Sequence, residues 1–298
     1  MVCAYLEPGS STVRAVVLLS GGGSNAEQLL RRWREAKSPV WQPAVLATDR
    51  PDKSRTRELA ECYGVPWVGV DIRAFYRERG EERMSILSER GQAIREEWTA
   101  ALRAAIAPYA PDFGVLAGFV PLTNLTADFP CLNVHPGDLT VEDAAGHRLL
   151  VGLHTIPVER AILAGRTDLR SSVIIAQPYT GSGGEMDTGP VLGISAPVAA
   201  DLCGKTVAEL QAIAGRRSGK RPGGGWKDEL ETIAAHNQER LKEGGDWVVF
   251  PPVVEDFAAG RFGTDESGQL HYRADAGWQA VRTVEFSREW KHPIPVAG

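Results

Sequence analysis

Short apolar runs alternate with amphipathic stretches through the first half of the chain, and this alternation constrains the fold most. Val13–Leu19 is apolar apart from Arg14, as expected for a strand that is covered on both faces of a sheet. Further strands are predicted at Pro43–Thr48, Trp67–Val70, Phe113–Ala117 and Cys131–Val134, and helices at Ala26–Lys37, Lys53–Tyr63 and Glu81–Tyr109. Strands that alternate with helices form parallel βαβ units, so we expect an α/β fold with a doubly wound, mostly parallel sheet.

The second half of the chain is less regular. We predict a helix at Val158–Leu163, strands at Ser172–Ala176 and Val191–Val198, and further helices at Trp226–Lys242 and Trp247–Ala259. A Gly- and Thr-rich loop separates the two strands at Gln177–Gly189, and Arg216–Gly225 is predicted to be a flexible, basic linker. We therefore expect one domain over residues 1–262, with an insertion at about 203–245, followed by a helical and short-β C-terminal extension at 263–298.

Composition excludes several classes of protein. The 298 residues carry a net charge of −5, which favours neither nucleic acid nor an anionic membrane surface as a partner. The chain has no apolar run of about 18 residues and no signal-peptide pattern at its start, so we expect a cytoplasmic protein. The cysteines are far apart and form no CxxC pair, which predicts reduced thiols and no metal site; they are Cys3, Cys62, Cys131 and Cys203.

A glycine-rich turn follows the first predicted strand and opens a helix. Its three glycines let the backbone turn sharply and bring N–H groups close to an anion at the helix N-terminus. The residues of this candidate phosphate site are Gly21, Gly22, Gly23, Ser24 and Asn25. Two alternatives remain open. The turn is also compatible with a ligand-free βα connection, and it matches a dinucleotide fingerprint through Gly21, Gly23 and Ala26, with Asp49 after the next strand.

A second candidate site lies at the end of the fifth predicted strand. Asn133 and His135 are two residues apart, so they project to the same side, and Pro136 keeps His135 extended. An amide and an imidazole at one point can hold a carbonyl oxygen and move a proton, although His135 alone is equally compatible with a structural role. Asp187, in a Gly-bounded turn, could orient His135 and favour its protonated form, but such an Asp is usually an ordinary turn residue.

Together these segments resemble the folate-dependent formyltransferase family and, within it, the glycinamide ribonucleotide (phosphoribosylglycinamide) formyltransferases. Five blocks occur in the order that the family shows, and a weaker sixth follows them. They are Val16–Asn25 (VVLLSGGGSN), Ala110–Phe119 (APDFGVLAGF), Leu132–Pro136 (LNVHP), Gly152–Thr155 (GLHT), Met186–Leu192 (MDTGPVL) and Trp247–Phe262 (WVVFPPVVEDFAAGRF).

The resemblance implies a Rossmann-like formyltransferase fold and transfer of a formyl group from 10-formyltetrahydrofolate to a primary amine, without a metal. It places the catalytic residues at Asn133, His135 and Asp187, the phosphate turn at Gly21–Asn25, and a ribose contact at Asp246. The implied folate pocket contains Leu116, Ala117, Gly118, Phe119, Val120, Leu132 and Met186, and His154 matches a family histidine. The partners would be folate and a small phosphorylated amine, with neither nucleic acid nor membrane, and a homodimer is compatible with the family.

Departures from the family pattern gather around the expected amine and folate sites. The segment after His135 reads Gly137–Thr140 in place of an apolar sequence, and Pro121 stands where an arginine is expected. Extra residues lie at 138–151, at 177–184 and at 203–245. The first of these segments adds Asp138, Glu142, Asp143 and His147. Carboxylates beside an amine site would favour a more cationic acceptor, unless the segment is a solvated surface loop.

Three other functions compete with amine formylation. A formyltetrahydrofolate hydrolase uses a similar triad with water, but it usually carries an N-terminal regulatory domain, and few residues precede the first strand here. A methionyl-tRNA formyltransferase would have a basic C-terminal domain, whereas this tail is mixed in charge. A nicotinamide-dependent oxidoreductase could use the Gly21–Ala26 turn, but it explains neither the Asn133/His135 pair nor Asp187. An inactive binding module would not need an intact triad.

Overall fold

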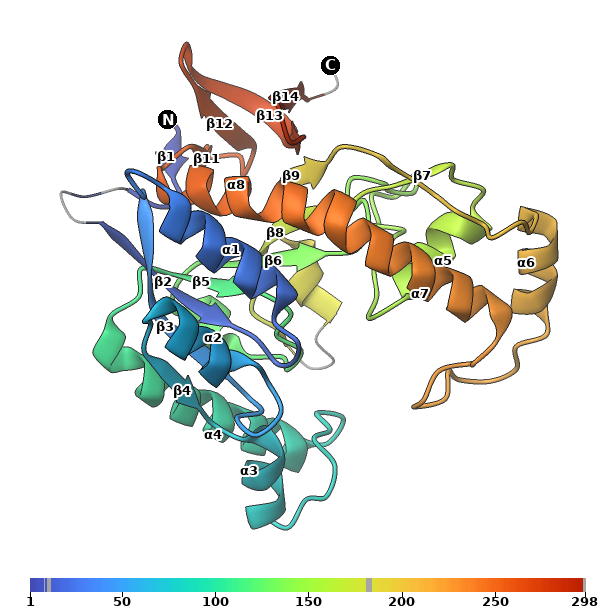
Figure 1. Cartoon of the computed structure of the whole chain (residues 1–298), viewed down its shortest axis with the longest axis horizontal. Helices are drawn as coiled ribbons and strands as arrows, with labels where there is room; N and C mark the ends of the chain where they lie inside the picture. Colours follow the sequence, from blue (N-terminus) through green and yellow to red (C-terminus); the bar gives the residue numbers. More distant parts are fainter. Residues whose placement is uncertain (8, 10–11, 181–183, 297–298) are drawn as a thin grey trace.

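A twelve-stranded sheet forms the centre of the computed structural model, which describes residues 1–7, 9, 12–180 and 184–296 (Figure 1). In spatial order its strands are β1 (Cys3–Ala4), β11 (Phe262–Thr264), β12 (Leu270–Ala274), β13 (Gly277–Phe286), β9 (Val191–Ser195), β8 (Ser172–Ala176), β6 (Cys131–His135), β5 (Phe113–Leu116), β2 (Val13–Leu18), β3 (Trp41–Thr48) and β4 (Trp67–Gly69). β14 (Lys291–Pro295) pairs with β13.

The strands predicted from the first half of the chain form the parallel part of this sheet. β6, β5, β2, β3 and β4 are all parallel neighbours. The chain proceeds from β2 outward to β3 and β4, then returns to the other side of β2 for β5 and β6. The strand order therefore reverses between β2 and β5, the place where ligands collect in such sheets. The α/β, doubly wound prediction is confirmed; beyond β6 the sheet becomes largely antiparallel.

Helices cover both faces of the sheet. α1 (Ser24–Glu35), α2 (Thr56–Tyr63) and α8 (Trp247–Ala258) pack on one face through a core that includes Leu29, Leu59 and Val253. α3 (Ile72–Glu78) and α4 (Glu89–Ile106) cover the other face through Tyr76 and Trp98. Strands that are buried on both sides need continuous apolar runs, which is why Val13–Leu18 carries so few polar residues.

A second, smaller helical group lies beside the sheet. α5 (Ile156–Leu163), α6 (Val207–Gly215) and α7 (Glu229–Leu241) share their own apolar cluster, flanked by the short strands β7 (Asp168–Leu169) and β10 (Val198–Ala199). α7 continues through a π-helical turn, η4 (Lys242–Asp246), into α8. Figure 1 shows these elements as one long rod that runs from the helical group across the sheet.

Several local predictions differ from the structure. The helix predicted at Glu81–Tyr109 starts at Glu89, because Ser88 caps it by accepting a hydrogen bond from the Gly91 N–H. It ends in the 3₁₀ turn η1 (Ala107–Tyr109), and a second such turn, η2 (Asn124–Ala127), follows β5. Two helices were not predicted, α3 and α6; both are short, and they start at a single cap on Asp71 and at a capping box of Thr206 and Glu209.

The segment Arg216–Gly225, expected to be a flexible linker, is held by ion pairs. Arg217 lies 2.5 Å from Glu159 on α5 and 2.7 Å from Asp228 at the start of α7, and Arg221 pairs with Glu231. The loop predicted at 177–189 contains the turn η3 (Gly184–Thr188), and its residues 181–183 lie outside the described part of the chain. None of the helices in the described ranges is long and apolar enough to cross a membrane.

Candidate active site

His135 and Asp187 lie close together although they are far apart in the chain. His135 is the last residue of β6, and Asp187 lies in η3, just before β9. The pairing of β6 with β8 and of β8 with β9 brings these strands side by side, so that Nδ1 of His135 is 4.0 Å from Oδ2 of Asp187. The carboxylate side chain is 31% exposed and the imidazole 5%, so the pair lies at the wall of the protein with Asp187 on the solvent side.

The hydrogen bond of His135 to Leu150, on the side of the ring away from Asp187, defines the tautomer of the imidazole. Nε2 lies 2.9 Å from the Leu150 carbonyl oxygen, which only accepts, so Nε2 carries the proton and donates it. In the neutral ring, Nδ1 then presents its lone pair toward Asp187. Burial lowers the pKa of His135, and this outweighs the opposing effects of Asp187 and of the Leu150 carbonyl. The free protein therefore holds a neutral imidazole at pH 7, which differs from the protonated form that we expected.

Asn133 lies on the same side of β6 as His135. Its neighbour in the parallel direction is Leu116 at the end of β5, and its antiparallel neighbour is Ile174. The residue is partly exposed, and within the described residues its side-chain amide has no hydrogen-bond partner. The amide N–H₂ is thus available to donate to an oxyanion beside His135.

Arg148 is a residue of this site that was not predicted. Its guanidinium donates to the backbone carbonyl of Asp187 and, at 2.7 Å, to that of Gly189. It therefore ties the loop after His135 to the turn that carries Asp187, and its charge acts to lower the pKa of His135. Arg148 falls in the segment that departs from the family pattern, so the resemblance contained no signal for it.

The carboxylates at Asp138, Glu142 and Asp143, which the family pattern lacks, form hydrogen bonds or ion pairs within the protein. Asp138 accepts hydrogen bonds from the backbone N–H and the hydroxyl of Thr140, at 3.0 and 2.5 Å. Asp143 pairs with His147 at 3.1 Å, and Glu142 lies 3.6 Å from Arg282. The charge of this segment that acts on the pKa of His135 is the cation of Arg148. His154, in the following block, is exposed and has a left-handed backbone.

The glycine-rich turn has the form of an anion site. α1 starts at Ser24 after Gly23, and no side chain caps its first N–H groups. The carbonyl oxygens of Gly21 and Gly22 accept from the backbone and the guanidinium of Arg55, at 3.1 and 3.2 Å. A Cβ added at Gly21 or Gly22 would meet open space. With the carbonyls directed to Arg55, the N–H groups of the turn and the helix dipole are left to face a ligand.

Asp246, at which the resemblance implies a ribose contact, lies beside this turn. Its carboxylate accepts from the Asn25 amide at 3.0 Å and from the Ser171 hydroxyl at 2.5 Å, and burial raises its pKa. Gly245 permits the approach, because a Cβ there would lie 2.6 Å from the Ser171 oxygen. Trp247 donates to the other end of the Asn25 amide at 3.1 Å. In the free protein these side chains hold the turn to α8, and a ribose would have to displace one of the contacts of Asp246.

The residues predicted for the folate pocket divide between the two faces of the sheet. Leu116, Phe119 and Met186 pack on the face that also carries Cys131, two residues before Asn133. Leu132 and Ala117 belong to the opposite core, under α1 and α8, and both are buried. Their side chains therefore cannot line a pocket on the Asn133 face, and only their backbone could contact a ligand there.

The two remaining residues of the predicted folate pocket lie at the end of β5. Val120 is 60% exposed, and its N–H donates to the Ser20 hydroxyl at 2.9 Å. The Gly118 carbonyl accepts from the Ser20 N–H at 3.2 Å. These two bonds join the end of β5 to the phosphate turn, so the predicted folate and phosphate residues lie on adjoining loops at one edge of the sheet.

Two formyltransferases are among the solved structures that resemble this chain. The phosphoribosylglycinamide formyltransferase of Coxiella burnetii matches 93% of this chain and all of its own, with 19% identity and a TM-score of 0.56. The glycinamide ribonucleotide transformylase 1 of Symbiobacterium toebii matches 89% and 95%, with 24% identity and a TM-score of 0.55. The chain has the fold of these formyltransferases.

A hydrolytic relative shares the fold as well. The formyltetrahydrofolate deformylase of Pseudomonas syringae pv. tomato matches 88% of this chain and 66% of its own, with 14% identity and a TM-score of 0.53. No protein-family model and no curated protein sequence matches the chain. At these identities the comparisons establish the fold, and the chemistry depends on the residues of the site.

Proposed function

We propose that this protein transfers a formyl group from 10-formyltetrahydrofolate to a primary amine. The observation that carries the proposal is the approach of Asp187 to the buried imidazole of His135, next to Asn133, whose amide has no partner among the described residues. The three side chains come from two separate strand ends, at the sheet edge where ligands bind in this class of fold. The same three positions were predicted from the family motifs.

The geometry assigns one task to each side chain. The amine nitrogen attacks the formyl carbon, and the carbonyl electrons move to the oxygen, where the Asn133 N–H₂ donates to the resulting oxyanion. Nδ1 of neutral His135 takes the proton that the amine loses, directly or through one water. Asp187 then stabilises the imidazolium, which returns the proton to N10 of the folate as the bond between the formyl carbon and N10 breaks. The products are a formamide and tetrahydrofolate.

The glycine-rich turn supports a phosphorylated acceptor. Its N–H groups and the N-terminus of α1 would bind the phosphate, while Asn25 and Asp246 hold the turn in place. We infer that the acceptor is glycinamide ribonucleotide or a related phosphorylated amine. The reaction would then belong to one-carbon metabolism and purine biosynthesis in the cytoplasm. The carboxylates of residues 138–143 give no reason to prefer a more cationic acceptor, because their partners lie within the protein.

Hydrolysis of the donor is the second candidate. The deformylase relative has the same fold, and a neutral His135 could take a proton from water as well as from an amine. The two reactions differ in what they release. Formyl transfer needs the amine and yields a formamide, whereas hydrolysis yields formate and does not depend on the amine.

The test is to mix the protein with 10-formyltetrahydrofolate, with and without glycinamide ribonucleotide, and to follow both tetrahydrofolate and the formylated product. We expect release that depends on the amine, with kcat/KM of about 10⁴ M⁻¹s⁻¹ or above if this amine is the acceptor. His135→Ala should lower kcat/KM by about 10²–10⁴, the usual contribution of an acid–base group. His147→Ala is the control, because His147 is exposed and lies in the same loop region.

Two results would change the assignment. Release of formate at the same rate without any amine would make the protein a hydrolase. Release that is equally fast in wild type and His135→Ala would remove the proposed site altogether.

A further inference from the structure

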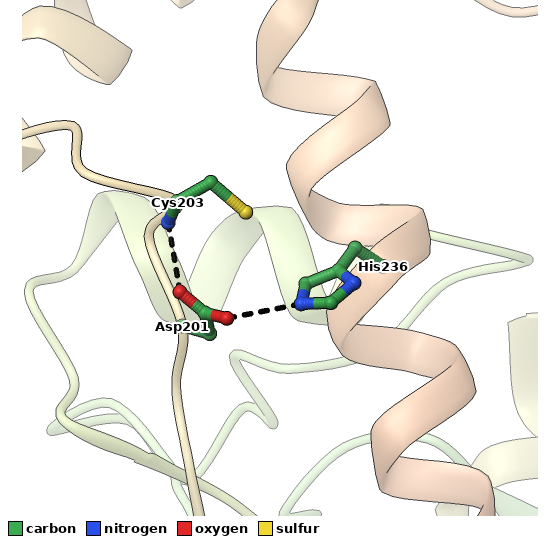
Figure 2. A group of neighbouring side chains, drawn as sticks. All are labelled: Asp201, Cys203 and His236. Atoms are coloured by element: carbon green, nitrogen blue, oxygen red, sulfur yellow. Dashed lines mark hydrogen bonds and ion pairs between the residues drawn. The ribbon is translucent and has the colours of Figure 1, made fainter.

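Three potential metal ligands meet in the helical group beside the sheet. Asp201 and Cys203 lie in the turn between β10 and α6, and His236 lies on α7 (Figure 2). One ligand atom of each residue, a carboxylate oxygen, the sulfur and a ring nitrogen, lies within 4.8 Å of the other two. Their separation along the chain explains why the spacing of cysteines and histidines did not predict this cluster, and why no metal was expected.

The distance between the Asp201 and His236 ligand atoms is close to that on a single tetrahedral ion. Oδ2 of Asp201 is 3.0 Å from Nε2 of His236. Two ligand atoms on a zinc ion, with bonds of about 2.0–2.1 Å, are roughly 3.3 Å apart at the tetrahedral angle. An ion could therefore take the place of the proton that joins Asp201 and His236. The sulfur of Cys203, which lies beside Asp201 and His236 in Figure 2, would be the third ligand.

Contacts outside the cluster hold the ligands in place. The other oxygen of Asp201, Oδ1, accepts from the Cys203 N–H at 2.9 Å, which leaves Oδ2 for an ion. The side chain of Asn237 is fully buried and clamps the backbone of Asp201 from both sides, at 2.8 Å to its N–H and 2.7 Å to its carbonyl. Asn237 is the neighbour of His236 on α7, so the turn and the helix are fixed to each other at the point where the ligands meet. Such outer contacts orient ligands in protein metal sites.

We propose that Asp201, Cys203 and His236 bind one divalent transition-metal ion of the zinc type. Thiolate, imidazole and carboxylate are the ligands that zinc accepts in tetrahedral sites, and three of them leave a fourth position for water. On binding, the sulfur gives up its proton to solvent, His236 coordinates through Nε2 with its proton on Nδ1, and the carboxylate binds as the anion. One proton is thus released for each ion bound when the thiol is protonated beforehand.

The consequence for the molecule is a bridge between two segments. The ion would join the turn after β10 to α7, and two of its ligands, Cys203 and His236, lie in the residues that the family pattern lacks. α7 continues through η4 to Asp246, ten residues beyond His236 and roughly 15 Å along the helical rod. The metal would therefore stabilise the helix that holds Asp246 against the phosphate turn, and it would not take part in the transfer reaction.

The test uses the full-length protein in its reduced form, freed of metal with a chelator and then titrated with Zn²⁺ or Co²⁺. We expect one ion per chain with a Kd below about 1 µM, and a near-ultraviolet charge-transfer band that marks a thiolate bound to Co²⁺. Cys203→Ser should abolish this band. Cys203→Ser and His236→Ala should each weaken Zn²⁺ at least about 10-fold, and all three ligands are exposed, so the variants should fold.

Two matched controls separate this cluster from surface binding. Cys62→Ser removes another exposed thiol, and His147→Ala removes a histidine that pairs with a carboxylate, Asp143, without a thiol in the pair. Both should bind the metal as the wild type does. The proposal is overturned if no stoichiometric binding occurs at tenfold excess metal, if Cys203→Ser retains full affinity and the band, or if the control variants lose as much affinity.

Discussion

At the scale of single residues, the site depends on one buried histidine between two opposite charges. Burial lowers the pKa of His135, Asp187 acts to raise it, and Arg148 acts to lower it. The first effect prevails, so the ring is neutral and can act as a base near pH 7. In the proposed reaction Asp187 would contribute mainly after the ring has taken the proton, because a carboxylate 4.0 Å away would stabilise the imidazolium.

The pH dependence of kcat/KM tests this balance of charges. Activity should fall with decreasing pH as His135 becomes protonated, with a midpoint below the ordinary histidine value of 6.5. Asp187→Asn removes the charge that raises the pKa of His135, so the acid limb should move to lower pH and the plateau should drop. Arg148→Met removes the charge that lowers this pKa, so the limb should move to higher pH.

The opposite directions of these two shifts are the decisive feature. Parallel shifts in both variants, or a limb in the wild type above pH 6.5, would contradict a neutral His135. Rates should be measured with saturating folate and low amine, and kcat/KM should be corrected for the fraction of unprotonated amine, so that it reports the complex of the enzyme with folate.

A glycine of the phosphate turn makes a second prediction at this scale. Gly23 has φ = 64°, and a Cβ there would lie 2.7 Å from Leu19 and 3.0 Å from Leu59, which are both buried. Gly23→Ala should lower the free energy of unfolding by about 2–4 kcal/mol, through the left-handed backbone and the overlap. Urea denaturation measures the loss. Gly22→Ala is the control and should change stability by less than about 0.5 kcal/mol, since the added Cβ meets open space.

At the scale of elements, the turn between β2 and α1 has partners for its carbonyls, whereas its N–H groups have none among the described residues. Arg55 holds the carbonyls of Gly21 and Gly22, while Asn25 is anchored to Asp246 and Trp247. Most polar groups of the turn therefore have hydrogen-bond partners in the described residues, apart from the backbone N–H groups that a phosphate would use.

Charge at position 22 tests the phosphate site. Gly22→Asp should raise KM for a phosphorylated amine about 10-fold or more, because a carboxylate would stand beside the phosphate. Gly22→Asn has nearly the same shape without the charge and should have a much smaller effect. If KM is the same in both variants and in the wild type, the turn does not bind the acceptor. Kinetics with an amine that lacks the phosphate should not distinguish Asp from Asn.

At the scale of the whole molecule, the C-terminal residues complete the sheet. β13 pairs in parallel with β9, and Val284 and Phe286 are buried in the same core as Val253 of α8. The N-terminal strand β1 pairs with β11 and forms the edge of the sheet beyond β12 and β13 (Figure 1). The residues that we expected to form a separate extension therefore contribute to the stability of the central sheet.

Truncation of Phe286 measures this contribution. Its ring lies over Gly193 of β9, where a Cβ would be 2.9 Å from it, and the residue is 1% exposed. Phe286→Ala should cost about 3–5 kcal/mol, as for other buried phenylalanines, and should lower Tm in a single transition. Trp290→Ala, at a residue that is 50% exposed, should change stability little. A second, independent melting transition for the C-terminal residues would contradict a shared core.

Local sequence patterns were sufficient to predict the parallel half of the sheet and the place of the turn before α1. The grouping of Asn133, His135 and Asp187 as one site stays a prediction from the family motifs. These features depend on local patterns: apolar runs, glycine in a tight turn, and motifs that contain their own residues. The resemblance implied a ribose contact at Asp246, and the structure adds that this residue accepts a hydrogen bond from Asn25 in the turn.

Only the tertiary structure decided the features that arise where distant segments meet. The protonation of His135 depends on burial by neighbouring segments and on Arg148, and neither can be read from residues 131–137. The cluster of Asp201, Cys203 and His236 exists because α7 packs against the turn after β10. The C-terminal strands have a weak sequence pattern, and their place in the sheet depends on the pairing of β13 with β9. Burial and electrostatic contact depend on distance in space, and a linear pattern records that distance only when the partners are close in the chain.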